Sequence, residues 1–415
     1  AKELGYHTIC TDRDPECMGA KEADAFEKAD VYSVNEQIVA ALKLKARYGT
    51  VLKGIFVGGI DAAHIASSVA KVMGWPGVNP QAAWLCRRKD LFRQRMKECR
   101  VRQPQFCVMQ AHSQVSKCQL PFDKHFIVKS VENSGGRGHT VFADDILAHV
   151  DFTAIFNAAE KAAHHNIGGS KDVLIEELLL GREFSIEIVT DGLSPSVTGE
   201  SGSIISKPHR WRYLNIVERY FAADSPYPIE VGHVNPAPIT LAEQDKLYDL
   251  TEQCAEAVEA SWGVFKCDAI WPADSPEPYV LEATCRWSGG FDSQETTPIS
   301  SGRDFLGFGI RQSAGEPVDI DDAALQPRWQ RAAASWCPLP EPMVLDHMDT
   351  AEAARVPGVE RVLIMPFATS GIRLGVTNSA ERPVYVIASG NTTEEALAAV
   401  KEGASKIKFI AKEQL

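Results

Sequence analysis

The stretch VFKCDAIWPADSPEPYVLEAT, residues 264–284, contains two strand-like runs joined by a segment rich in turn-forming residues. Asp268 and Glu282 stand fourteen residues apart in the two runs, and this spacing predicts a β-hairpin with both carboxylates side by side. Two neighbouring carboxylates repel each other unless a cation or a proton lies between them. The hairpin therefore predicts either a magnesium site completed by phosphate oxygens or a cross-strand pair of solvated acids. Because like charges are normally avoided at opposed positions of a sheet, the pattern favours the metal.

The residues that follow, CRWSGGFDS at 285–293, place Arg286 four residues after Glu282 and then a pair of glycines. A guanidinium group binds phosphate well, and glycines allow the backbone to approach a ligand closely. A strand end with a surface salt bridge and a simple turn has the same pattern. The stretch becomes informative only together with the rest of the chain.

A second informative stretch is FIVKSVENSGGRGHTV, residues 126–141, in which a strand delivers Lys129 and a glycine-rich loop follows. Backbone N–H groups of such a loop can surround phosphate oxygens, and a nearby lysine adds a positive charge. The pattern is neither the P-loop signature nor a Rossmann fingerprint. A mobile hairpin loop beside a surface lysine is an equally good interpretation of the loop alone. The loop residues expected to face phosphates are Ser134, Gly135, Gly136 and Arg137.

Residues 173–189, VLIEELLLGREFSIEIV, predict two strands of one sheet. In the second strand Glu183 alternates with apolar residues, which is the period of two typical of a half-buried strand. The apolar side chains could sandwich an aromatic base, and Glu176, Glu177 and Glu183 flank the segment. Glutamates that face solvent from two ordinary strands are the alternative, and the segment alone favours that alternative.

The composition limits the class of protein. The 415 residues exceed what one hydrophobic core usually serves, so two or three domains are expected. The net charge of −12, from 43 basic and 55 acidic residues, disfavours a nucleic-acid partner. No apolar run approaches the ~20 residues of a membrane helix, and the cysteines form no CxxC pair. We expect a cytoplasmic protein with reduced thiols and no membrane partner.

The first part of the chain, residues 1–83, predicts an α/β domain. Helix patterns near 36–47 and 61–73 alternate with a strand pattern at 54–59, which is typical of βαβ units and a parallel sheet. The chain begins in a helical pattern that leads directly into a strand at 6–11. One further strand is therefore expected before it.

The rest of the chain predicts mixed α+β structure. Residues 84–325 contain the motifs described above and a helix that begins with a capping box at Thr240 and Glu243. A segment rich in proline and tryptophan precedes the last strands and helix, so residues 326–415 predict a small α+β domain.

Taken in this order, the stretches resemble the ATP-grasp superfamily, and in particular its carboxylate-amine ligase branch, which includes L-amino acid ligases and relatives of carbamoyl phosphate synthetase and of the purine-pathway ligases. The resemblance covers nearly the whole chain. It implies a parallel-sheet domain at 1–83, a two-lobed ATP-grasp domain at 84–325 and a small C-terminal domain at 326–415. It also implies ATP and Mg²⁺ as cofactors, small-molecule carboxylate and amine substrates and, by the habit of the family, a homodimer.

The resemblance implies a role for each residue of the nucleotide site. Lys89 and Lys129 would contact the ATP phosphates, and residues 133–139 would form a loop that closes over them. The adenine would meet Glu176, Glu177 and the backbone around Leu179, and the ribose would meet Glu183.

The resemblance also implies that Asp268 and Glu282 bind magnesium and that Arg286 faces the transferred phosphate. The family usually has Asn two residues after the second acid, as a further metal ligand, but this chain has Thr284 there. A hydroxyl binds magnesium weakly or through water, so the departure weakens the expectation of a second metal ion.

Two alternatives to an ATP-dependent ligase remain open from the sequence. The departure at Thr284 is compatible with a non-catalytic module that binds ATP and couples it to a partner or sensor role. An oxidoreductase rests only on the βαβ start and Asp12, because the chain has no glycine fingerprint for a dinucleotide. Substrate choice is expected to depend on residues 201–235 and on the stretch after Trp287.

Overall fold

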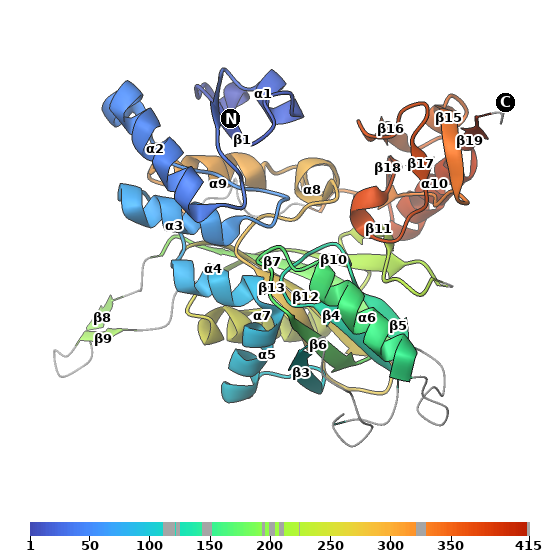
Figure 1. Cartoon of the computed structure of the whole chain (residues 1–415), viewed down its shortest axis with the longest axis horizontal. Coiled ribbons are helices and arrows are strands. Elements are labelled where there is room, and N and C mark those ends of the chain that lie inside the picture. The colour runs from blue at the N-terminus through green and yellow to red at the C-terminus, as the bar shows by residue number, and fades with distance from the viewer. Residues whose placement is uncertain are drawn as a thin grey trace.

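The computed structural model describes residues 1–110, 121, 125–142, 152–192, 196–198, 204–206, 211–223, 225–320 and 329–412. Two antiparallel sheets form its centre, and Figure 1 shows the N-terminal helices at the upper left and the C-terminal strands at the upper right. This arrangement confirms the expected α/β and α+β fold class. No helix within the described ranges is long and apolar enough to span a membrane.

The N-terminal segment combines a small parallel sheet with a layer of helices. Strands β1 and β2 pair in parallel, as expected. The Ser33 side chain accepts a hydrogen bond from the Glu36 N–H at the start of α2, and Gly74 ends α3 with a left-handed φ of 70°. The elements are β1 (Ile9–Asp12), α1 (Met18–Glu22), β2 (Ala25–Lys28), α2 (Val34–Tyr48), α3 (Ala63–Met73), α4 (Pro80–Arg87) and α5 (Lys89–Glu98).

The strand expected at residues 54–59 is absent from the described structure, so this prediction was wrong. Only Gly58 makes an isolated parallel bridge, with Trp287. A cavity of about 640 Å³, lined mainly by apolar residues, borders both this segment and β1. Among the described residues the segment therefore has no neighbouring strand to pair with, and an extended backbone forms a strand only when a neighbour pairs with it.

A four-stranded antiparallel sheet in the order β3-β6-β4-β5 forms one of the two central layers. Helix α6 packs on it, and Ile155 of the helix is buried in one apolar cluster with Phe126, Val128 and Ile175 of the sheet. The elements are β3 (Phe106–Gln110), β4 (Phe126–Ser130), β5 (Thr140–Phe142), α6 (Phe152–His164) and β6 (Asp172–Glu177).

An eight-stranded antiparallel sheet in the order β13-β12-β7-β10-β11-β14-β18-β16 forms the second central layer. Phe184, Ile186 and Ile188 of β7 pack in one core with Leu247 and Leu250 of α7, which confirms the apolar face expected for this strand. The strand is not half-buried as expected, because Ser185 and Glu187 on its other face are buried as well. The capping box expected at the start of α7 is also present. The elements up to residue 313 are β7 (Gly181–Thr190), β8 (Ser196–Thr198), β9 (Ile204–Ser206), β10 (Arg212–Phe221), β11 (Glu230–Asn235), α7 (Leu241–Ala257), β12 (Gly263–Pro272), β13 (Tyr279–Thr284), α8 (Thr297–Ser301) and α9 (Phe305–Ser313).

The C-terminal segment adds strands to the same large sheet. Strand β14 pairs with β11 and with β18, and α10 packs on β14 and β18. The predicted domain limit at residue 326 falls within 321–328, outside the described residues. The elements are β14 (Ala332–Trp336), β15 (Met343–Asp349), β16 (Val359–Ile364), β17 (Arg373–Leu374), β18 (Val384–Gly390), α10 (Thr393–Ser405) and β19 (Lys408–Ala411), with β17-β15-β19 as a separate sheet.

Candidate active site

A cavity of about 320 Å³ lies between the four-stranded and the eight-stranded sheets, and side chains of both charges form its wall. Lys89 reaches this wall through a contact with Glu282, whereas Thr284 does not line the cavity. The structure thus gathers most of the residues singled out in the sequence. Those that line the cavity are Lys129, Ser134, Gly135, Gly136, Arg137, Glu176, Glu177, Leu179, Glu183, Asp268, Glu282 and Arg286.

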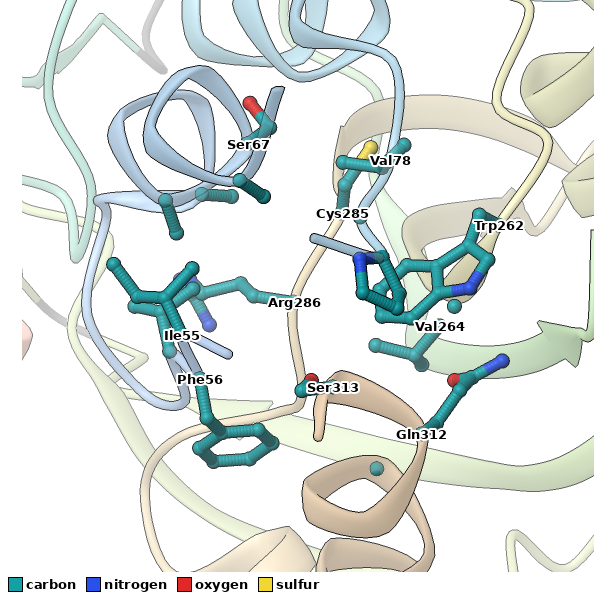
Figure 2. Close-up of a pocket in the computed structure, with 18 of the residues that line it drawn as sticks. Ile55, Phe56, Ser67, Val78, Trp262, Val264, Cys285, Arg286, Gln312 and Ser313 are labelled. Atoms are coloured by element: carbon teal, nitrogen blue, oxygen red, sulfur yellow. The ribbon is translucent and has the colours of Figure 1, made fainter. Parts of the chain in front are cut away.

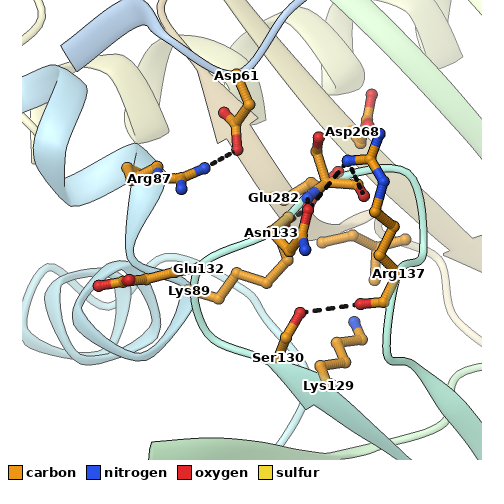
Figure 3. Close-up of polar contacts among 12 residues, drawn as sticks. Asp61, Arg87, Lys89, Lys129, Ser130, Glu132, Asn133, Arg137, Asp268 and Glu282 are labelled. Atoms are coloured by element: carbon orange, nitrogen blue, oxygen red, sulfur yellow. Dashed lines mark hydrogen bonds and ion pairs between the residues drawn. The ribbon is translucent and has the colours of Figure 1, made fainter. Parts of the chain in front are cut away.

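The two acids of the hairpin occupy opposed positions, as their spacing predicted: Asp268 of β12 is the register partner of Glu282 of β13. Glu282 forms an ion pair with Lys89 at 2.7 Å, and Asp268 forms one with Arg219 at 3.1 Å. Lys266, two residues before Asp268 on β12, also contacts Asp268. Figure 3 shows Lys89 beside Glu282, with Asp268 close by. Each acid of the pair is therefore neutralised by its own cationic neighbours.

The acids of the cavity differ in protonation because their surroundings differ. Burial opposes ionisation of Glu282, but Lys89, Lys266 and Lys129 hold its pKa well below the ordinary value. At Glu183 burial outweighs the attraction of a nearby arginine and raises the pKa to about 7. Glu282 is therefore ionised at neutral pH, whereas the pKa of Glu183 lies near neutral pH.

Glu176 is engaged by two cations. It is 1% exposed, and its two oxygens lie 2.5 Å from Arg93 Nε and 2.5 Å from Lys129 Nζ. Burial opposes ionisation, but the two cations lower the pKa of Glu176 to about 2. Arg93 also donates to the carbonyls of Val280 and Leu281, which ties α5 to β13. Glu176 therefore positions Lys129 at the cavity, and its contact with adenine stays a prediction.

The glycine-rich loop adopts backbone angles that other residues rarely adopt. Gly135, Gly136 and Gly138 have φ values of 67°, 74° and 77°. A Cβ on Gly138 would lie 2.9 Å from the Cβ of His165, so the loop also passes too close to the residue that follows α6 for a larger side chain. These angles turn the chain so that residues 134–137 line the cavity.

Both sides of the cavity hold this loop in place. Lys89 Nζ donates to the carbonyl of Asn133 at 2.8 Å, and Arg137 Nη1 donates to Asn133 Oδ1 at 3.0 Å (Figure 3). On the other side, the Ser379 N–H donates to the carbonyl of Gly135 at 2.9 Å. The loop consequently bridges the lysine at the acid pair and the C-terminal segment.

Arg286 lies between the main cavity and a smaller one of about 50 Å³ (Figure 2). Its Nη1 donates to the carbonyl of Trp287 at 3.1 Å, whereas its Nε is buried without a hydrogen-bond partner. A buried donor without an acceptor destabilises the protein, so an anion at this place would be stabilised. Thr284, at the end of β13, is the register partner of Lys266, and its role as a metal ligand stays a prediction.

Three basic residues of the cavity wall were not singled out from the sequence: Arg219, Lys266 and Arg382. Arg219 of β10 lies 3.1 Å from Asp268, 3.1 Å from Glu230 and 3.7 Å from Glu183. These acids outweigh burial and raise the pKa of Arg219 well above its ordinary value. Lys266 could have been found, because it lies two residues before Asp268 and so on the same face of the strand.

The two sheets with this cavity between them define an ATP-grasp fold, as the sequence resemblance predicted. The chain is similar to L-amino acid ligase from Bacillus licheniformis, with a TM-score of 0.78, 16% identity, and 99% of this chain and 94% of that chain covered. It is also similar to N5-carboxyaminoimidazole synthetase from Staphylococcus aureus complexed with ADP, with a TM-score of 0.67, 14% identity, and 97% and 92% covered.

Among curated proteins, the uncharacterized protein y4rH of Sinorhizobium fredii (strain NBRC 101917 / NGR234) is 23% identical over 398 residues. The match covers 93% of this chain and 74% of y4rH. No protein-family model matches the chain. These comparisons establish the fold, and the reaction has to be inferred from the site.

Proposed function

We propose that the protein is an ATP-dependent carboxylate-amine ligase that works through an acyl phosphate and releases ADP and phosphate. The observation that carries the proposal is the acid pair, Asp268 and Glu282, in one cavity with Arg286 and a glycine-rich loop. The similarity in fold to L-amino acid ligase supports the same reaction class. Substrates of this reaction are small molecules that the cavity of about 320 Å³ can enclose in part.

The nucleotide is expected along the β4–β6 side of the cavity. Lys129 and Lys89 face the phosphates in this proposal, and residues 133–139 cover them with backbone N–H groups. The backbone at Leu179 meets the adenine, and Glu183 meets the ribose. With a pKa of about 7, Glu183 can accept or donate a hydrogen bond to a ribose hydroxyl.

The acid pair fits magnesium by the chemistry of its oxygen donors. Within the described ranges no group of three or more His, Cys, Asp and Glu residues could hold a metal ion. A protein site with only two carboxylates suits magnesium, which commonly takes its remaining ligands from substrate phosphates and water. Asp268 and Glu282 would hold the ion, which supplies charge neutralisation at the phosphates.

In the proposed reaction the protein positions groups and stabilises charge, and forms no covalent bond itself. An oxygen of the substrate carboxylate bonds to the terminal phosphorus of ATP, and the bond from that phosphorus to ADP breaks. Arg286, whose Nε has no partner, stabilises the negative charge that develops there. The nitrogen of the amine then bonds to the acyl carbon, phosphate leaves, and the amine nitrogen loses a proton.

A module that binds ATP without turnover is the second candidate. One observation favours it: Thr284, at the position where the resemblance expects a metal ligand, does not line the cavity. Such a module would keep the adenine side of the cavity and lack turnover.

Phosphate release separates the two candidates. The purified protein is incubated with MgATP and with separate pools of amino acids and other small carboxylates. The ligase requires release that depends on a pool member and falls to background in the Glu282→Ala variant. Glu277→Ala is the matched control, because Glu277 lies in the turn of the same hairpin and pairs with Lys246 and Arg102 instead. ATP binding without release from any pool would favour the module.

A further inference from the structure

A buried serine in the wall of the main cavity has no role in the steps above. Ser185 of β7 is 5% exposed and lines the cavity between the two sheets. Among the described residues its Oγ has no hydrogen-bond partner. Buried hydroxyls are normally hydrogen-bonded, so the Ser185 side chain indicates a partner that a ligand supplies.

The strand register places this hydroxyl in line with the acid pair. Ser185 of β7 is the register partner of Asp268 of β12, and Asp268 is the register partner of Glu282 of β13. Directly opposed residues of antiparallel strands point to the same face of the sheet, with Cβ atoms about 5 Å apart. All three side chains line the cavity, so they form one row across three neighbouring strands. We call Ser185, Asp268 and Glu282 the oxygen row.

The cations nearest to the oxygen row contact its carboxylates. Lys89 contacts Glu282, and both Lys266 and Arg219 contact Asp268. An ionised carboxylate has about four acceptor positions on its two oxygens. Asp268 and Glu282 can therefore each bind a further cation, and the Ser185 hydroxyl stays available beside it.

The place of Ser185 in the row favours a partner that belongs to the magnesium ion. Two carboxylates leave most of the coordination sphere of magnesium to water and to phosphate oxygens. Groups of the protein that hydrogen-bond to the ligands of a metal ion orient those ligands and strengthen metal binding. A hydroxyl directly opposite Asp268 is placed for this purpose, whereas Lys129 and the glycine-rich loop approach the cavity from the other sheet.

Thr284 occupies a different place. It is the register partner of Lys266, one step along β13 from the oxygen row, and it does not line the cavity. Thr284 and Ser185 each offer a hydroxyl as a third oxygen beside the acid pair. Of the two, Ser185 is the one that lines the cavity together with both acids.

We propose that Ser185 is the third oxygen of the magnesium site and hydrogen-bonds to the hydration shell of the ion that Asp268 and Glu282 hold. The inference rests on the proposed ligase function, because that function requires the ion. It gives Ser185 the part that the resemblance expects at the position of Thr284. Each of the strands β7, β12 and β13 then contributes one oxygen-bearing side chain to the site.

Calorimetry of nucleotide binding tests the inference without turnover. The analogue β,γ-methylene ATP, whose terminal phosphate is not transferred, is titrated into the full chain in excess Mg²⁺ and, separately, in EDTA. The ratio of the Kd in EDTA to the Kd in Mg²⁺ is the gain in affinity that magnesium provides. We expect Ser185→Ala to lower this gain by about tenfold and to leave the Kd in EDTA unchanged. An equally large loss in EDTA would assign the hydroxyl to a phosphate oxygen and overturn the inference.

Ser389→Ala is the matched control, because Ser389 of β18 belongs to the same large sheet and its hydroxyl donates to Glu360 outside the cavity lining. This variant should leave the gain unchanged. Ser185→Cys is a second variant, because a thiolate prefers a soft metal ion to magnesium. We expect it to raise the gain from Cd²⁺ relative to the gain from Mg²⁺, compared with wild type.

The outcomes separate this inference from the proposed function. A gain that Glu282→Ala abolishes and Ser185→Ala leaves intact would refute the role of Ser185 and keep the magnesium site of the ligase. A loss of the gain in Thr284→Ala but not in Ser185→Ala would return the role to Thr284. If magnesium provides no gain in the wild type, both the inference and the magnesium site of the proposed ligase are wrong.

Discussion

The buried pairing of Glu176 with Arg93 and Lys129 predicts a large and pH-dependent effect of Glu176→Gln. The variant keeps the size of the side chain and removes the charge that faces two cations at 2.5 Å. The ordinary pKa of 4.5 falls to about 2 in the folded protein, which corresponds to roughly 3 kcal/mol at neutral pH, because one pKa unit is about 1.4 kcal/mol. We expect Glu176→Gln to lower the free energy of unfolding by about this amount.

The sign of the pH dependence follows from the lowered pKa. A depressed carboxyl pKa contributes stability above the unfolded value of 4.5, and this contribution is lost as the pH falls toward 2. Urea unfolding followed by fluorescence should therefore show a difference between wild type and Glu176→Gln that is largest at pH 7 and about half as large at pH 3.

Glu177→Gln is the control for this experiment, because Glu177 is partly exposed and, among the described residues, accepts a hydrogen bond from the Gln105 N–H. Its cost should stay below about 1 kcal/mol at both pH values. An equal difference for Glu176→Gln at pH 7 and pH 3 would refute the ionic origin of the stabilisation.

Two further predictions concern the loop and a helix start. Gly138→Ala should lower ATP-dependent phosphate release by about tenfold, because φ is 77° and the new Cβ would lie 2.9 Å from the Cβ of His165. Gly169→Ala is the control: φ is 73° there too, but open space surrounds the new Cβ, so release should stay unchanged. Thr240→Ala should lower the free energy of unfolding by about 1 kcal/mol in urea, because Thr240 and Glu243 form the capping box of α7, and an unchanged midpoint would contradict this.

Local patterns allowed much of the fold and site to be predicted from the sequence. The register of Asp268 and Glu282 follows from their spacing and from the turn-forming residues between them. The start of α7 follows from the three-residue spacing of Thr240 and Glu243. The positive φ angles of the glycine-rich loop follow from its composition. In each case the signal and the structure that it predicts lie within one short segment.

The remaining features depend on residues that are far apart in the chain. Arg93, which donates a hydrogen bond to Glu176, is 83 residues away from it in the chain. No local pattern therefore indicates that Glu176 is already paired with a cation. Arg219 joins acids from three other strands, and its role emerges only when the strand order is known. The segment 54–59 has the composition of a strand, but no described neighbour pairs with it.

The pairing of β11 with β14 determines which parts of the molecule share one sheet. Val234 faces Ala334 in this pairing, so the acid pair and the C-terminal strands belong to one continuous hydrogen-bonded sheet. No described strand joins the four-stranded sheet to it, and Lys129 and the glycine-rich loop belong to that smaller sheet. Separation of the small sheet from the large one would therefore break the hydrogen bond between the Ser379 N–H and the Gly135 carbonyl, but no pairing between described strands.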